Sequence, residues 1–179
     1  MVDKKHNCHE HFKTRRATIK RPYHFVESGL PNVYLVGIDY RACETCQSQS
    51  AEIPALEDLM TKIARAVVQK EGPLTGAEIR FLRKRLRKKA SDFARTIGVS
   101  PEQVSRWEND GNPPAESADK LIRVYYSLLS EDPALQEKVN AHINEWLSTL
   151  PGEDHTASFR AELHENKWDA EPIAATAIA

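Results

Sequence analysis

The spacing of three small or apolar residues between positions 94 and 104 is the feature that most constrains the fold of this chain. Ala94, Gly98 and Val104 stand at the offsets that two helices need if they are to cross at a tight turn. The small Ala94 lets the helices approach each other, and Gly98 permits the positive φ that the turn requires. Val104 fills the space between the helices. Together these residues predict a helix-turn-helix motif.

Capping residues predict the helices around this motif. Thr75 and Glu78 have the spacing of a capping box, which opens a helix. The next helix ends at Gly98, and the third begins with Ser100 as its cap and Pro101 in the first turn, where a missing N–H costs nothing. The sequence thus predicts an all-α domain of five helices. The last two helices are expected at 115–129 and 134–150.

The N-terminal part of the chain has a different pattern. Residues 23–27 and 33–40 read as short strands joined by the turn at 28–32, which is a β-hairpin. Residues 55–69 then change to helical spacing. The expected fold class is therefore α+β, a small zinc-bound β-hairpin module followed by the five-helix domain. The expected domain limits are 1–70 for the N-terminal module, 71–130 for the helix-turn-helix domain, and 131–179 for a helical extension with a flexible acidic tail.

The zinc in this prediction comes from two pairs of metal-binding residues that share one spacing. Cys43 and Cys46 are separated by two residues, and so are Cys8 and His11. Two such pairs on either side of a hairpin give the tetrahedral Cys₃His set that structural zinc prefers. The sequence therefore predicts one structural Zn²⁺ per chain, with Cys8, His11, Cys43 and Cys46 as ligands.

The identity of the fourth ligand stays open, because His6 and His9 lie near His11 in the sequence. A redox role for the C-x-x-C pair would require it to open a helix in a thioredoxin-like βαβ unit, and the sequence contains no such unit. A zinc site with four protein ligands has no open position for a substrate. The sequence also lacks a nucleophile–base pair and a Gly-rich phosphate loop, so we expect a protein that is not an enzyme.

Charge is distributed unevenly along the chain. Residues 76–111 hold nine basic and five acidic residues, a net charge of +4, whereas residues 130–179 hold three and ten, a net charge of −7. A basic middle is typical of a surface that faces nucleic acid, although cations on solvated helices give the same counts. The three cysteines, an odd number, argue against a disulfide framework. No signal peptide or membrane span is apparent, so the expected location is the cytoplasm.

The segment from Gly98 to Glu108 resembles the Cro/repressor (XRE-type) helix-turn-helix module. That resemblance implies that the third helix enters the major groove of DNA and reads base edges with its first turns. By position, the base-reading residues are Glu102, Gln103 and Arg106. Arginine can donate two hydrogen bonds to guanine, and glutamate can accept from cytosine. Glu102 has an equally good second interpretation as a partner of the helix dipole.

The same resemblance assigns other residues to structure or to the DNA backbone. Arg83 and Glu108 match positions that form a buried ion pair in related repressors, and Trp107 matches a core position. A phosphate-binding Gln is common in the family where this chain has Ala90. The expected phosphate contacts are therefore Lys88, Lys89, Ser105 and Asn109.

Over residues 8–129 the chain resembles the MqsA-type (YgiT-type) antitoxins of toxin–antitoxin pairs. The resemblance runs through Glu27-Ser28-Gly29-Leu30, Cys43 to Cys46, Ile53-Pro54 and Leu74 to Arg83, and then through the helix-turn-helix. It implies a bacterial homodimer that binds a palindromic operator, represses transcription, and holds an RNA-cleaving toxin with its zinc module. Those relatives have C-x-x-C at both ends of the module, whereas this chain has Cys8-x-x-His11. A free-standing regulator without a toxin is the alternative, and a thiol or zinc enzyme is a third.

Overall fold

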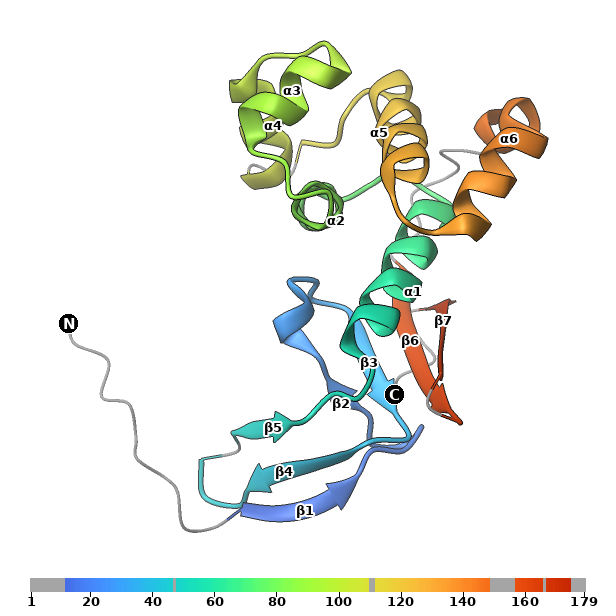
Figure 1. Cartoon of the computed structure of the whole chain (residues 1–179). Coiled ribbons are helices and arrows are strands. Elements are labelled where there is room, and N and C mark those ends of the chain that lie inside the picture. Colours follow the sequence, from blue (N-terminus) through green and yellow to red (C-terminus); the bar gives the residue numbers. More distant parts are fainter. Residues whose placement is uncertain (1–11, 47, 110–111, 149–156, 166, 175–179) are drawn as a thin grey trace, which may run out of the picture.

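The computed structural model describes residues 12–46, 48–109, 112–148, 157–165 and 167–174. In these residues the chain forms six α-helices and seven strands, an α+β fold. Figure 1 shows a helical part lying above a β part, with helix α1 (Leu56–Gln69) running between them. None of the helices in the described ranges is long and apolar enough to cross a membrane.

Three strands near the N-terminus form an antiparallel sheet of order β1-β4-β5. They are β1 (Phe12–Arg16), β4 (Asp39–Cys43) and β5 (Gln49–Ala51). Phe12 is paired with Cys43 and Arg16 with Asp39. The sheet forms a curved layer at the end of the molecule that is farthest from the helices (Figure 1).

The hairpin predicted over 23–40 forms, but with shorter strands. Its strands are β2 (Tyr23–His24) and β3 (Val33–Val36), which pair antiparallel. Val26–Ser28 forms a 3-10 turn where the sequence suggested strand. Gly37 has a φ of +78° and ends β3, so that the predicted strand 33–40 divides between two sheets. A positive φ breaks the extended backbone, and glycine adopts it without steric cost.

The end of the chain differs most from the prediction. Helix α6 (Pro133–Ser148) matches the expected helical extension, but the flexible tail is wrong for residues 157–174. There β6 (Ala157–His164) and β7 (Lys167–Ala174) form a hairpin, and β6 pairs in parallel with β3. The second sheet therefore has the order β2-β3-β6-β7. Apolar residues alternate with polar ones in this segment, a strand pattern that a search for helical spacing misses.

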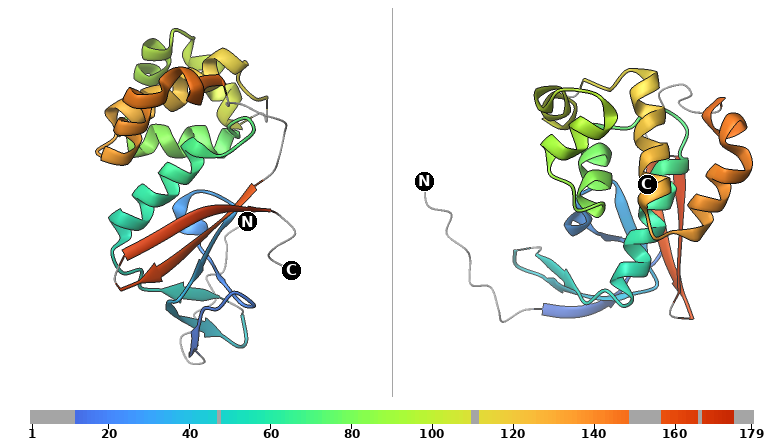
Figure 2. Two further views of the ribbon diagram at one scale, coloured as in Figure 1. Left: turned by 90° about the vertical axis from the view of Figure 1, so that its right-hand side faces the viewer. Right: turned by 45° about the horizontal axis from the view of Figure 1, so that its top comes forward.

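The buried side chain of Trp168 joins this hairpin to the rest of the molecule. Trp168 is fully buried, and its ring N–H donates to the Pro54 carbonyl at 2.8 Å. Its backbone N–H donates to an Asp58 carboxylate oxygen at 2.9 Å, which ties β7 to α1. Figure 2 shows the hairpin lying beside α1 and below the other helices. The N-terminal and C-terminal segments thus build one β module.

The four helices of the helix-turn-helix domain agree closely with the sequence. They are α2 (Gly76–Arg85), α3 (Ala90–Ile97), α4 (Pro101–Asn109) and α5 (Glu116–Leu129). The capping box forms. The Glu78 carboxylate accepts from the Thr75 backbone N–H at 2.7 Å, and the Thr75 hydroxyl accepts from the Glu78 backbone N–H. Gly98 ends α3 with a φ of +74°, and the Ser100 hydroxyl accepts from the Gln103 N–H at 3.1 Å.

A buried arginine holds the connection between the two parts of the molecule. Arg123 of α5 is fully buried, and its guanidinium donates to the carbonyl groups of Val68 and Lys70, both at 2.8 Å, and of Gly72. It is also paired with Asp119, whose second oxygen accepts from the Leu74 N–H. These bonds fix the segment after α1, where the sequence predicts the boundary between the first two domains.

Candidate nucleic-acid interface

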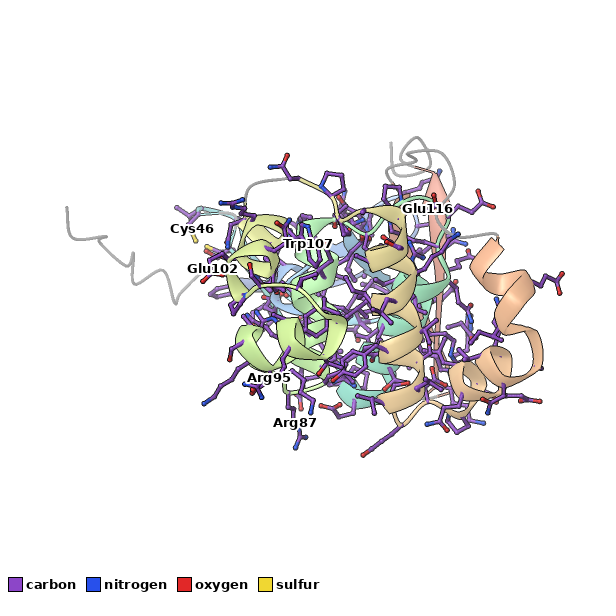
Figure 3. The ribbon with its side chains drawn as sticks, turned by 90° about the horizontal axis from the view of Figure 1, so that it is seen from above. Cys46, Arg87, Arg95, Glu102, Trp107 and Glu116 are labelled. Carbon is purple, nitrogen blue, oxygen red and sulfur yellow. The ribbon has the colours of Figure 1, made fainter. Side chains whose placement is uncertain are left out.

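Helix α4 presents one face to the core and the other to solvent. Val104 is fully buried and Trp107 is nearly so, which places Trp107 in the core as the sequence predicts. Glu102, Ser105 and Arg106 are exposed on the opposite face. Figure 3 shows Glu102 at the outer edge of the domain, away from Trp107. The exposed face therefore carries two of the three predicted base-reading side chains, and the third, Gln103, is half-buried beside them.

The position of α4 is set by a close contact with the start of α2. A Cβ atom at Gly76 would lie 2.2 Å from the Trp107 carbonyl oxygen, a distance at which backbone atoms cannot remain. Glycine is thus required at position 76, because the two helices approach each other there more closely than any side chain allows. Helix α3 also packs against α4, and its Phe93 and Ala94 are buried. The exposed face of α4 is consequently held by rigid neighbours.

The Glu102 carboxylate is exposed and interacts with the N-terminus of its own helix. Its backbone N–H and the Ser100 hydroxyl lower the pKa of the Glu102 carboxyl from its ordinary value, and Arg106 one turn later adds to the effect. The carboxylate is therefore ionised and is a partner of its own helix N-terminus. Since it is also exposed, it is available as an acceptor at the surface.

The pair expected between Arg83 and Glu108 is present. The Arg83 guanidinium donates to both carboxylate oxygens of Glu108, at 2.7 and 2.8 Å, which is the bidentate geometry of a strong pair. These hydrogen bonds raise the pKa of Arg83. Arg83 also donates to the Lys88 carbonyl at 2.9 Å, so that the turn after α2 is tied to α4.

Arg80 is a second partner of Glu108 that the sequence did not single out. It donates to the Glu108 carbonyl at 2.8 Å and to the side-chain oxygen of Asn109. The Asn109 amide in turn donates to the Ser105 carbonyl at 2.8 Å and to its hydroxyl at 3.3 Å. Ser105 and Asn109, both predicted phosphate contacts, are thus hydrogen-bonded to each other. The i, i+3 spacing of Arg80 and Arg83 on α2 is the signal that could have indicated their shared partner.

The two predicted phosphate-binding lysines lie in the turn between α2 and α3. Lys88 and Lys89 are exposed, and Lys89 is the residue that precedes α3. Arg87 before them has a φ of +55°, a left-handed conformation that ends α2. These cations stand beside the N-terminus of α3, where backbone N–H groups also favour an anion.

The predicted metal ligands fall partly outside the described residues. Cys8 and His11, with the alternatives His6 and His9, lie in the undescribed N-terminal segment. Cys43 is buried at the end of β4, whereas Cys46 is exposed in the turn that leads to β5. The Cys43 backbone N–H donates to the Ser48 carbonyl at 2.9 Å, which closes this turn. Within the described part of the chain, no three metal-binding side chains gather in one place.

Comparison with known proteins bears on the helical half. Residues 79–125 match the family model described as Helix-turn-helix. This segment is an XRE-type helix-turn-helix domain. The protein is accordingly a DNA-binding transcriptional regulator, and α4 is the second helix of its helix-turn-helix motif. Neither a curated protein nor a solved structure matches the chain significantly.

Proposed function

We propose that this helix-turn-helix protein is the antitoxin of a toxin–antitoxin pair and represses transcription of its own operon. The observation that supports this most is the separation of its two halves. The recognition helix α4 lies in the upper helical part, whereas the β1-β4-β5 sheet lies at the opposite end of the molecule (Figure 1). A protein bound to that sheet would leave the DNA-reading surface free.

The exposed chemistry of α4 indicates how the operator is read. Arg106 is the base-reading donor, because an arginine in the major groove can contact guanine O6 and N7 together. The Glu102 carboxylate accepts from cytosine N4 nearby. Lys88 and Lys89 neutralise phosphates, so that affinity falls as the salt concentration rises.

Replacing Arg106 with alanine should weaken binding to the operator by about 1–3 kcal/mol and relax specificity at one base pair. The matched control is Arg95→Ala, because Arg95 lies on α3, is 80% exposed at its side chain, and has no assigned base. A gel shift on the gene's own promoter, with each variant and at one salt concentration, measures the difference. Equal affinity of the two variants would remove Arg106 from base reading.

A homodimer fits the apolar surface of the last helices. Leu121, Leu128 and Leu129 of α5 and Ile143 of α6 are all at least 36% exposed. We infer that a second subunit covers these side chains. A two-fold dimer would present two copies of α4 to a palindromic operator. A titration that gives two chains per operator duplex is the expected result, and one chain per duplex would contradict it.

The N-terminal module fits a structural zinc ion. The thiols of Cys43 and Cys46 lie at the end of the sheet where β1 begins, since Phe12 pairs with Cys43. Phe12 directly follows His11 in the sequence, and Cys8 lies three residues before His11. The sequence directly before β1 thus carries a third thiol and an imidazole, and together with Cys43 and Cys46 these make a donor set that zinc accepts. Zinc bound there would contribute folding energy to the module.

The freshly reduced protein should contain one zinc per chain, and Cys46→Ser should lose it, because a hydroxyl is a poor substitute for a thiolate ligand. Thr45→Ser is the control, since it changes the same turn without removing a thiol. Elemental analysis of the purified proteins measures the ratio. Zinc that is absent from the wild type, or retained in full by Cys46→Ser, would overturn the assignment.

Co-expression tests the antitoxin role. The tagged chain is produced together with the small open reading frame next to its gene, and the purified material is applied to their shared promoter. A stable complex that shifts the promoter is the expected result. A shift without a co-purifying partner would instead favour the second candidate, a free-standing regulator of the same fold.

A further inference from the structure

Four polar side chains form one stripe along the exposed face of α4. Glu102, Ser105, Arg106 and Asn109 follow the i, i+3, i+4, i+7 spacing of a single helix face, and all four are exposed. Glu102 and Arg106 have the roles proposed above. Ser105 and Asn109 lie beyond the first turn of the helix and have short side chains. They are therefore suited to the phosphates beside the groove rather than to base edges.

The direction of the hydrogen bonds at Asn109 follows from the chemistry of Arg80. A guanidinium has N–H donors and no acceptor, so the Asn109 atom that faces Arg80 is its side-chain oxygen. The NH₂ group of Asn109 then faces the other way. There it donates to the Ser105 carbonyl at 2.8 Å and to the Ser105 hydroxyl oxygen at 3.3 Å.

The hydroxyl of Ser105 is left as a donor by this arrangement. Because its oxygen accepts from Asn109, its hydrogen points away from Asn109, and among the described residues it has no acceptor. Ser105 is exposed on the same stripe as Arg106. The oxygens of a DNA phosphate are acceptors only, so they match a hydroxyl whose polarity is fixed in this way.

Arg80 is itself held in place against α4. It donates to the Glu108 carbonyl at 2.8 Å, and its Nε lies 3.4 Å from the Glu108 carboxylate, which is also the bidentate partner of Arg83. Gly76, one turn before Arg80, is the position where α2 and α4 come into backbone contact. Side chains that are ordered before DNA arrives lose less conformational entropy when it binds.

We infer that Arg80 and Asn109 are positioning residues for DNA binding, which hold the Ser105 hydroxyl as a donor to a DNA phosphate. Asn109 then acts through Ser105, whereas the sequence predicts a direct phosphate contact. Arg80 acts one step further away, from a different helix. This inference rests on the proposed reading of DNA by α4, but on neither the toxin, the zinc nor the autorepression.

A double-mutant cycle tests the inference, because residues that act through one another give losses that do not add. The full chain is prepared as Arg80→Ala, Ser105→Ala and the double variant, and DNA affinity is measured by fluorescence anisotropy at one salt concentration. The duplex is selected with the wild type from a pool of random sequences, so that it does not depend on the promoter. In the control cycle Lys84→Ala replaces Arg80→Ala. Lys84 is exposed one turn further along α2, and it has no hydrogen bond to α4 among the described residues.

Arg80→Ala and Ser105→Ala should each weaken binding about threefold to tenfold, the usual worth of one hydrogen bond. The double variant should bind within about twofold of the weaker single variant, whereas the factors of the control cycle should multiply. Asn109→Ala breaks the same chain of hydrogen bonds without changing α2. It should reproduce the Arg80→Ala result, and it takes the place of Arg80→Ala in the cycle if that variant does not fold. The Ser105→Ala loss should be equal on duplexes that differ by one base pair.

Unchanged affinity of Ser105→Ala or of Arg80→Ala would overturn the inference, and so would losses that multiply as in the control cycle. A Ser105→Ala loss that is limited to one base pair would assign the hydroxyl to a base edge and overturn the phosphate contact. Arg106→Ala on the same duplex reports separately on α4. No loss in Arg106→Ala would contradict the proposed function, whereas a loss there with none in Ser105→Ala would contradict the inference alone.

Discussion

Replacing Arg123 with alanine is expected to lower the free energy of unfolding by about 3–5 kcal/mol, the range for breaking a buried charge pair. The substitution removes the donor from three backbone carbonyl groups and leaves the carboxylate of Asp119 buried without its cation. Because those carbonyls belong to the last turn of α1 and to the segment that follows it, the β module should also separate more easily from the helices. Urea denaturation measures the loss of stability.

Arg95→Ala is the control for this experiment, since its side chain is 80% exposed and its loss should change stability by less than about 0.5 kcal/mol. A loss of only that size for Arg123→Ala would contradict the structural role assigned to the buried guanidinium. If Arg123→Ala fails to fold, Arg123→Lys provides the measurement. Lysine retains the charge beside Asp119, but it cannot reach all three carbonyls with a planar fork.

Replacing Trp168 with alanine should cost about 3–5 kcal/mol, as is usual when a buried tryptophan is truncated. Trp168 is fully buried, and its ring N–H joins β7 to the Pro54 carbonyl by a hydrogen bond. We expect the β6–β7 hairpin to open before the helical domain unfolds. Denaturation measures the cost, and hydrogen exchange over residues 157–174 measures the local opening.

Trp168→Phe separates the two contributions of this residue. Phenylalanine keeps most of the apolar area but has no ring N–H, so the loss should be clearly smaller than for alanine. An equally large loss would assign the effect to the hydrogen bond. Unchanged protection of residues 157–174 in Trp168→Ala would contradict the role of Trp168 in holding the hairpin.

Local signals in the sequence were sufficient to predict the helices of the helix-turn-helix domain. The capping box at Thr75, the left-handed Gly98 and the Ser100 cap all depend on residues within a few positions of one another. Their geometry is decided by backbone hydrogen bonds at helix ends, so the sequence specifies it directly. The Arg83–Glu108 pair is more distant, and the family resemblance supplied it.

The candidate DNA surface was predicted in part for the same reason. Helical spacing places Glu102 and Arg106 on one exposed face and Val104 and Trp107 on the other. The spacing says nothing about which polar groups already have partners. The hydrogen bond from Arg80 to the Asn109 side chain is known only from the tertiary structure, because the two residues meet where α2 packs against α4.

The sequence by itself determined the helices, their caps and the α+β division, since each depends on the periodicity and the turn chemistry of a short segment. The tertiary structure alone decided that residues 157–174 pair with the N-terminal hairpin beside β3 and that Arg123 holds the segment after α1. Each of these features joins residues that are far apart in the chain. The sequence of a short β-strand does not specify which strand it pairs with. A buried charged side chain is stable only where the fold supplies hydrogen-bond partners for it.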